Sequence, residues 1–293
     1  MVLDLAGYPI AVELPEGDMA ARAAERYRGF IAPPGAPAAF RLAIRIDRAA
    51  RPANFHPVHV DNPPVRSAGD LDSARVGGDG FDGELDWTAG AGRAVIPDSL
   101  AHLDLFVRIA LGVALLRAGD TLLHASAVVR DHFAIAFAGP SGAGKSTIAA
   151  ICAAGGLPVL ADEMIAVHHA GLGTRVAGTP FWNGAPRSAP AGALMFLAHA
   201  PAPTLTRITA DRALPRLLAA GGAPLGLPAV QQAFFAACAA LLRRVPAYVL
   251  EFAPDPGFWA AVDRLPEFGY FRPRGAALPA RLPALAARKE QHR

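Results

Sequence analysis

The sequence predicts an α/β protein with a small β-rich N-terminal domain over residues 1–97 and a second domain, with a mixed sheet flanked by helices, over residues 98–293. Two observations lead to this fold class. A glycine-rich segment, GPSGAGKST at residues 139–147, follows an apolar strand-like run and precedes a helix-forming run. Residues 1–97 instead carry short apolar pieces separated by many Gly, Pro and Asp turn signals.

The length and charge of the chain narrow the function classes. With 293 residues, it has room for one large or two modest domains with a real core. Lys and Arg total 28 against 25 Asp and Glu, and the basic residues are mostly scattered arginines. A net charge of +3 without a basic cluster gives no indication of a nucleic-acid surface.

Membrane and secretory segments are not expected. The hydrophobic fraction of 53% is raised by alanine, and arginines interrupt the two longest apolar candidates, Leu103–Leu116 and Phe234–Leu250. The N-terminal segment carries acids and no Lys or Arg ahead of an apolar run, unlike a secretory signal. The two cysteines, Cys152 and Cys238, suit reduced thiols, so we expect a cytoplasmic protein.

The elements expected before the glycine-rich segment are mostly strands. In the N-terminal domain we expect a helix over Gly17–Tyr27 and strands over Ala39–Asp47 and Pro57–Asp61. A helix over Asp98–Ala118 should follow, with a start signal at Pro97 and a stop at Gly119. We expect this helix to lead into the second domain, and its two polar residues His102 and Asp104 to be solvated or packed rather than catalytic.

A tight antiparallel hairpin is expected directly before the glycine-rich segment. Its strands would be Leu122–Val129 and His132–Ala138, with Arg130 and Asp131 as the two-residue turn. The numbers of two facing residues would then add up to 261. His124 would therefore lie opposite Phe137, at the mouth of the glycine-rich segment. A histidine in a strand is more often structural, but this one falls where a γ-phosphate would lie.

The glycine-rich segment fits the phosphate-loop pattern G-x-x-x-x-G-K-[ST]. Its glycines allow successive backbone N–H groups to point at one anion at the positive end of a helix over Lys145–Ala154. Lys145 would reach the β- and γ-phosphates, and the Ser146 hydroxyl would bind Mg²⁺. The alternative is a glycine-rich turn that binds nothing. The expected nucleotide-binding residues are Gly139, Ser141, Gly142, Ala143, Gly144, Lys145, Ser146 and Thr147.

Two carboxylates interrupt the next apolar strand, expected over Val159–Val167. Charges in such a segment are costly unless they are paired or bound to metal. Asp162 and Glu163 are therefore candidate Mg²⁺ ligands, and Asp162 is a candidate general base for a hydroxyl nucleophile. The alternative is a solvent-facing carboxylate on an edge strand.

The remaining segments give weaker indications. Residues 176–184 read as a turn followed by Phe181 and Trp182, which would form either a core corner or the wall of a binding site. Arg187 and Arg207 are candidate transition-state cations or ordinary surface residues. The further expected elements are strands at 193–198, 204–209 and 248–252, helices at 211–221 and 228–244, a final helix opening near 256, and a frayed tail from about residue 282.

The motifs LLHASAVV, GPSGAGKST and LADE, in this order and spacing, resemble the catalytic domain of HPr kinase/phosphorylase and its relatives in the PEP-carboxykinase-like superfamily. The resemblance covers roughly residues 98–265 and rests mainly on the hairpin with a histidine before the phosphate loop and on the acidic pair after it. It implies ATP- and Mg²⁺-dependent phosphorylation of a hydroxyl, with Asp162 as general base, His124 near the phosphates and Lys145 on the nucleotide.

The chain also departs from the pattern of HPr kinases. Glu163 replaces a second Asp, and GTPFWNG stands where those enzymes carry a glutamate signature. Residues before 98 differ as well, so the resemblance implies a stand-alone kinase whose acceptor is a serine in a peptide or protein, or a small molecule, rather than HPr. Family members often form oligomers, which implies a possible homo-oligomer. The other hypotheses are a non-catalytic ATP-binding scaffold, sensor or maturation partner and, less favoured, a carboxykinase.

Overall fold

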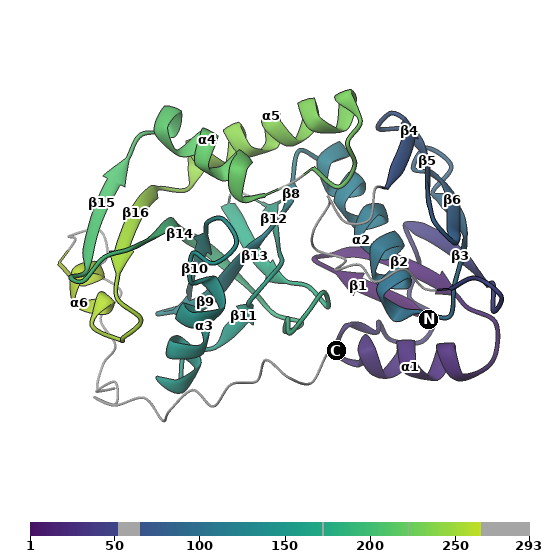
Figure 1. Cartoon of the computed structure of the whole chain (residues 1–293), viewed down its shortest axis with the longest axis horizontal. Helices are drawn as coiled ribbons and strands as arrows, with labels where there is room; N and C mark the ends of the chain where they lie inside the picture. Colours follow the sequence, from purple (N-terminus) through teal and green to yellow (C-terminus); the bar gives the residue numbers. More distant parts are fainter. Residues whose placement is uncertain (52–64, 172, 222, 265–293) are drawn as a thin grey trace.

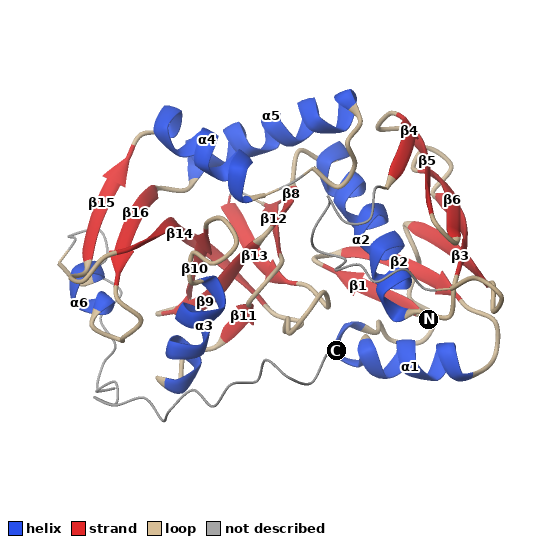
Figure 2. Cartoon of the chain, in the orientation of Figure 1, coloured by secondary structure: helices blue, strands red, loops and turns tan. Residues whose placement is uncertain are grey.

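A computed structural model describes residues 1–51, 65–171, 173–221 and 223–264. The protein is an α/β structure with two mixed β-sheets and helices packed against them (Figures 1 and 2). This confirms the expected α/β class with mixed sheets flanked by helices. The expected strand over Pro57–Asp61 and the expected frayed tail lie outside the described residues.

The N-terminal part forms a seven-stranded sheet in the order β1-β2-β3-β7-β6-β5-β4. Its strands are β1 (Val2–Leu5), β2 (Tyr8–Glu13), β3 (Phe40–Ile46), β4 (Arg66–Gly69), β5 (Ser73–Gly78), β6 (Phe81–Asp86) and β7 (Ala91–Ile96). β3 runs parallel to both β2 and β7, and every other pair is antiparallel. Helix α1 (Asp18–Arg26) and a 3₁₀ turn (Arg28–Phe30) connect β2 to β3. The helix expected over Gly17–Tyr27 and the strand expected over Ala39–Asp47 are thus confirmed.

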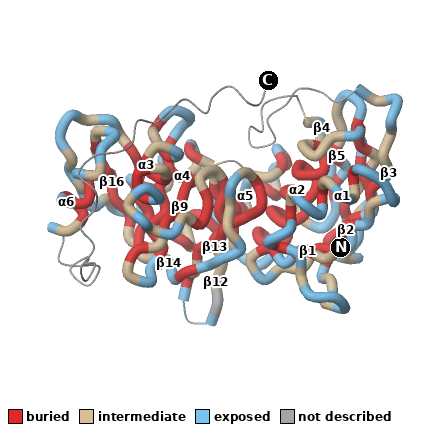
Figure 3. Tube along the Cα trace, turned by 90° about the horizontal axis from the view of Figure 1, so that it is seen from below, coloured by how far each residue is buried: buried red, intermediate tan, exposed pale blue. Residues whose placement is uncertain are grey.

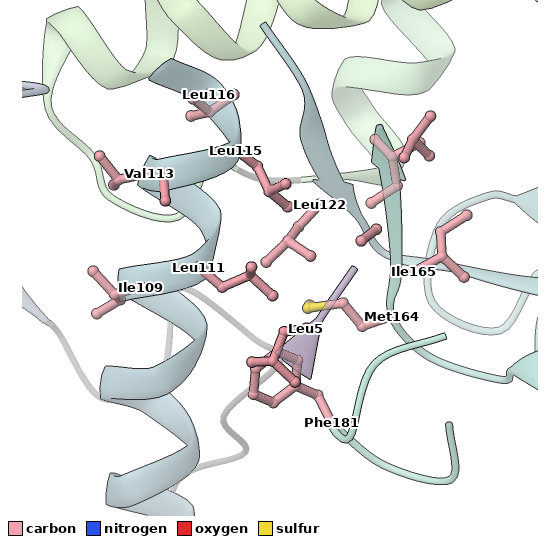
Figure 4. Close-up of a cluster of buried hydrophobic side chains, with 14 of the residues drawn as sticks. Leu5, Ile109, Leu111, Val113, Leu115, Leu116, Leu122, Met164, Ile165 and Phe181 are labelled. Carbon is pink, nitrogen blue, oxygen red and sulfur yellow. The ribbon is translucent and has the colours of Figure 1, made fainter. Parts of the chain in front are cut away.

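Helix α2 (Leu100–Arg117) confirms the long helix expected after Pro97 and is buried on nearly all sides. Such a helix has to pack against several elements at once. On one side it contacts the N-terminal sheet, where the indole N–H of Trp87 donates to the carbonyl oxygen of Ala110 at 3.0 Å. On the other side Leu111 and Leu115 lie beside residues of later strands (Figure 4). One hydrophobic cluster therefore runs from the N-terminal sheet through α2 into the second half of the chain.

The polar residues of α2 are also buried. His102 is fully buried, with its ring edge-on to Phe81, and Asp104 is 4% exposed. The carboxylate of Asp104 accepts hydrogen bonds from the hydroxyl of Tyr27 at 2.5 Å and from Arg26 at 2.9 Å. Both residues are thus packed, and Asp104 ties α1 to α2.

The second half of the chain contains a nine-stranded sheet whose main path is β11-β9-β10-β14-β13-β12-β8, with β16 and β15 added beside β14. Its strands are β8 (Thr121–Leu123), β9 (Ala125–Arg130), β10 (Phe133–Ala138), β11 (Val159–Ala161), β12 (Ile165–Ala170), β13 (Gly173–Gly178), β14 (Ser188–His199), β15 (Thr204–Ile208) and β16 (Ala247–Phe252). β14 lies between β10 and β16 and runs parallel to both. β14 pairs with β13 at its start and with β10 and β16 further on.

The two faces of this sheet carry different side chains and different helices. Ala127, Ala134, Ala136 and Ala138 face the cluster shared with α4 (Ala210–Ala220) and α5 (Pro228–Arg244). The larger alternate residues of the same strands, such as Phe137, face a second cluster with α3 (Lys145–Ala154) and α6 (Phe258–Val262). In Figure 3 the buried residues accordingly concentrate along the strands and α2. Among the described residues, no helix is long and apolar enough to cross a membrane.

Two of the expected strands are each divided in two. The segment expected as one strand over Leu122–Val129 is broken at His124, between β8 and β9. The segment expected over Val159–Val167 is broken at residues 162–164, between β11 and β12. β8 pairs with β12, whereas β9 pairs with β11. Both segments therefore change partner strands at the break. His124 occupies the first break, and Asp162 and Glu163 lie in the second.

The hairpin expected before the glycine-rich segment is present, but its expected register is wrong. The turn residues are Asp131 and His132, with φ of 49° and 74°, and facing positions run from Arg130 opposite Phe133 to Ala125 opposite Ala138. Phe137 therefore faces Ser126 and not His124. Positive φ at both positions is the requirement of a type I′ turn, and Asp and His adopt it more readily than Arg.

Candidate functional site

The ends of three neighbouring strands form the site. β10 and β11 both pair antiparallel with β9, so they run parallel to each other on either side of it. Their C-terminal residues, Ala138 and Ala161, consequently end at the same edge of the sheet, next to the start of β9. In α/β sheets the C-terminal ends of parallel strands are the usual place for ligands.

The glycine loop, Gly139–Thr147, connects β10 to α3 at this edge (Figure 1). Gly142 and Gly144 have φ of 81° and 100°, a backbone conformation that favours glycine. A Cβ on Gly144 would lie 2.9 Å from the ring of Phe252, and one on Gly139 would lie 2.8 Å from Cβ of Ala143. A Cβ on Gly142 would meet nothing within 4 Å, so the left-handed backbone, and not crowding, favours glycine there.

Lys145 is the first residue of α3 and is 6% exposed. Its ammonium group donates to the carbonyl oxygens of Gly139 at 3.0 Å and Pro140 at 3.2 Å. Burial lowers the pKa of Lys145, and the nearby charge of Glu163 opposes that shift. The lysine thus lies inside the curve of the loop, and its charge interacts with that of Glu163.

The interrupted strands bring together the polar residues expected to act with the loop. Nε2 of His124 lies 2.7 Å from a carboxylate oxygen of Glu163, and both side chains are mostly buried. Glu163 in turn influences the pKa values of Lys145 and of Asp162. The structure therefore groups His124, Lys145, Asp162 and Glu163 beside the glycine loop, although His124 pairs with Glu163 and not with a strand residue.

Asp162 has the environment of a base that is partly withdrawn from water. Burial raises the pKa of its carboxyl group, hydrogen bonding from Asn183 lowers it, and the adjacent charge of Glu163 raises it. Its Oδ1 atom is buried and has no hydrogen-bond partner among the described residues. A buried carboxylate oxygen of this kind is available to a proton donor or a cation.

A second loop, which we call the clamp loop (Thr179–Ala185), holds the backbone on both sides of this carboxylate. The N–H of Ala185 donates to the carbonyl oxygen of Leu160 at 2.7 Å, and the hydroxyl of Thr179 donates to that of Met164 at 2.8 Å. The acidic pair lies between these two anchor points. The clamp loop also carries Asn183, which contacts Asp162.

The conformation of the clamp loop is tightly constrained. Trp182 has φ of 65°, an uncommon value for a bulky residue. A Cβ on Gly184 would lie 1.7 Å from the carbonyl oxygen of Thr179, and one on Gly178 would lie 2.2 Å from that of Ala185. Phe181 is buried in the core, which is one of the two positions expected for it. Trp182 is partly buried and packs against the same hydrophobic cluster. Sequence reasoning missed Asn183, although the paired glycines around FWN signal a compact, fixed turn.

The remaining candidates differ in their positions. Ser141 and Ser146 are exposed on the glycine loop, and Thr147 is half-buried. Arg187 lines a different cavity of about 460 Å³, between the β1–β2 turn and the start of β14. Arg207 lies on β15 opposite Tyr248, four residues before the end of β16.

The predicted Mg²⁺ site would include phosphate oxygens of a bound nucleotide as ligands. Among the described residues, no group of three or more His, Cys, Asp or Glu side chains could hold a metal ion. Mg²⁺, however, is commonly held by one or two carboxylates together with phosphate oxygens. The unpartnered Oδ1 of Asp162 fits such a ligand, with Ser146 and Glu163 as the other expected ones.

In comparisons with known proteins, no protein-family model matches the chain and no curated protein is significantly similar to it in sequence.

Proposed function

We propose that the protein is a kinase that transfers the γ-phosphoryl group of Mg²⁺-bound ATP to a serine-like hydroxyl of a peptide, a protein or a small molecule. The observation that carries the proposal is the half-buried carboxylate of Asp162, whose buried Oδ1 atom has no hydrogen-bond partner among the described residues, beside a glycine loop that encloses Lys145. A site that only binds nucleotide needs the loop but not a base next to it.

The arrangement of the strands supports an HPr-kinase-like fold for residues 98–264 within this proposal. A hairpin, β9–β10, precedes the glycine loop, and an acidic pair follows the next strand, β11. The resemblance of the three motifs to HPr kinase/phosphorylase is based on the same elements.

Each side chain has a proposed role. Asp162 accepts the proton of the attacking hydroxyl, and burial raises its pKa towards the range in which a carboxylate is an effective base. Lys145 leaves the carbonyl oxygens of Gly139 and Pro140 to bind the β- and γ-phosphates, where it stabilises the charge on the transferring group. His124, held by Glu163, positions or neutralises the transferring phosphoryl group.

ATP and Mg²⁺ would supply the phosphoryl group and neutralise its oxygens when bound. The backbone N–H groups of the glycine loop would hold the phosphates, and Ser146, Asp162 and Glu163 would hold the metal ion. Both cysteines are free and buried, which suits the reduced thiols expected of a cytoplasmic protein.

The test is incubation with γ-labelled ATP and Mg²⁺ in the presence of free serine or serine-containing peptides, followed by mass spectrometry of the acceptor. We expect Asp162→Asn and Lys145→Ala each to lower turnover by about 100-fold or more while the fold stays intact. Asp82→Asn, which changes an exposed carboxylate in the N-terminal sheet, is the matched control. Near-normal turnover in Asp162→Asn would contradict the assignment of the base.

A non-catalytic ATP-binding scaffold or sensor is the other outcome of this experiment. It predicts that the wild-type protein binds ATP but yields no phosphorylated product from any acceptor.

A further inference from the structure

We infer that His199 fixes the orientation of the Gly142–Ala143 peptide group in the glycine loop and so raises the affinity of the loop for the phosphates of a nucleotide. The inference rests on the proposed function and adds to it a residue outside the loop motif.

His199 is the last residue of β14, which runs parallel to β10 and β16. It therefore lies at the same edge of the sheet as the glycine loop. Its Nε2 atom is 3.1 Å from the carbonyl oxygen of Gly142. A carbonyl oxygen can only accept a hydrogen bond, so Nε2 carries the hydrogen and donates it.

The imidazole ring is held in place by Phe252, the last residue of β16. The two rings are stacked, with centroids 6.0 Å apart and planes inclined by 24°. Phe252 is itself 1% exposed and touches the glycine loop, since a Cβ on Gly144 would lie 2.9 Å from its ring. His199 thus has a fixed position relative to the loop, set by two strand ends.

The hydrogen bond determines which way a loop amide points. In a trans peptide group the C=O of one residue and the N–H of the next point in opposite directions. Because His199 holds the carbonyl of Gly142, the N–H of Ala143 points away from His199 and towards the inside of the loop. There it donates to the carbonyl oxygen of Pro140 at 3.1 Å, next to the ammonium group of Lys145.

The hydrogen bond from the N–H of Ala143 to Pro140 also holds this peptide group, so the bond from His199 adds a second restraint against its rotation. Such a rotation changes ψ of Gly142 and φ of Ala143, and Gly142, which has free space at its missing Cβ, offers little resistance to the change in ψ. A rotated peptide would turn the carbonyl oxygen of Gly142 inwards, where it would repel phosphate oxygens. The donor on His199 therefore favours the arrangement that attracts an anion.

The experiment measures Mg²⁺-ATP binding to the full chain by isothermal titration calorimetry. His199→Phe keeps an aromatic ring for stacking on Phe252 but removes the donor, and His199→Gln keeps an N–H donor without the ring. We expect His199→Phe to bind roughly 5- to 10-fold more weakly than wild type, the equivalent of one lost hydrogen bond. His199→Gln should stay within about twofold of wild type.

His168→Phe is the matched control, because His168 is a half-buried strand histidine that lines the separate cavity with Arg187. Thermal unfolding checks that every variant is folded. Equal affinity of wild type and His199→Phe, or equally weak binding by His199→Phe and His199→Gln, overturns this inference and leaves the proposed function intact. Absence of nucleotide binding by the wild-type protein overturns both.

Discussion

The geometry of the clamp loop predicts the effect of Gly184→Ala on stability and turnover. Alanine there would place Cβ 1.7 Å from the carbonyl oxygen and 2.8 Å from the carbonyl carbon of Thr179. These are backbone atoms, so no side chain can rotate away. Since non-bonded carbon contacts lie at about 3.5 Å or more, the two halves of the loop have to separate by more than about 1 Å.

Two effects follow from this displacement. Overpacking against a fixed backbone lowers the free energy of unfolding by about 2–3 kcal/mol. The displacement also moves Asn183 away from Asp162, and a misplacement of about 1 Å near a reacting group lowers turnover by about 100-fold. Gly184→Ala should therefore be less stable and nearly inactive while still folding.

Gly173→Ala is the matched control, because a Cβ on Gly173 at the start of β13 meets nothing within 4 Å. Urea denaturation gives the free energy of unfolding of both variants, and phosphotransfer from labelled ATP gives turnover. A Gly184→Ala protein within about 0.5 kcal/mol of wild type would refute the steric argument. A destabilised variant with full turnover would refute the link from the clamp loop to Asp162.

Two further predictions concern single side chains. Asn183→Ala should lower kcat about 10-fold and leave the KM for ATP unchanged, because Asn183 contacts Asp162, the proposed base. Steady-state kinetics checks this split, and a rise in KM alone would contradict it. Burial lowers the pKa of His102 from 6.5 to about 4, so the unfolded chain takes up a proton first as the pH falls. The stability present above pH 6.5 should fall by about 3 kcal/mol by pH 4, and urea titrations should show a smaller loss in His102→Leu.

Local sequence signals predicted the glycine loop well. α3 begins at Lys145 and ends at Ala154 as expected, and Ile148, Ile151 and Cys152 are buried. The apolar strand before α3 and the glycines of the loop are signals within a few neighbouring residues. They can therefore be recognised without knowledge of the rest of the fold. The α2 helix was predictable for the same reason, although the burial of its polar residues depended on partners far along the chain.

The strand breaks were not predictable from hydrophobicity. LLHASAVV and VLADEMIAV are continuous apolar runs apart from His124 and the acidic pair, and each reads as one strand. Whether a chain continues or changes partner at a polar residue depends on which strands lie beside it. Here β8 and β12 form one pair while β9 and β11 form another, and only tertiary structure specifies that.

The predicted register of the hairpin was wrong for a different reason. The turn was placed at the most polar pair, Arg130 and Asp131, although polarity does not determine turn position. The need for positive φ selects Asp131 and His132 instead. Arg130 remains in the strand, where it pairs with Asp263 at 2.7 Å and stacks over the ring of Trp259.

The burial of α2 on all sides has a consequence for how far the two parts of the chain are interchangeable. A helix with a polar face could keep its place if a different domain were attached in front of it. In α2, Trp87 of the N-terminal sheet binds a helix carbonyl, and Asp104 receives two donors from α1 and the residue after it. A transplanted N-terminal domain would have to match these polar contacts as well as the apolar surface, so the two halves can change only together.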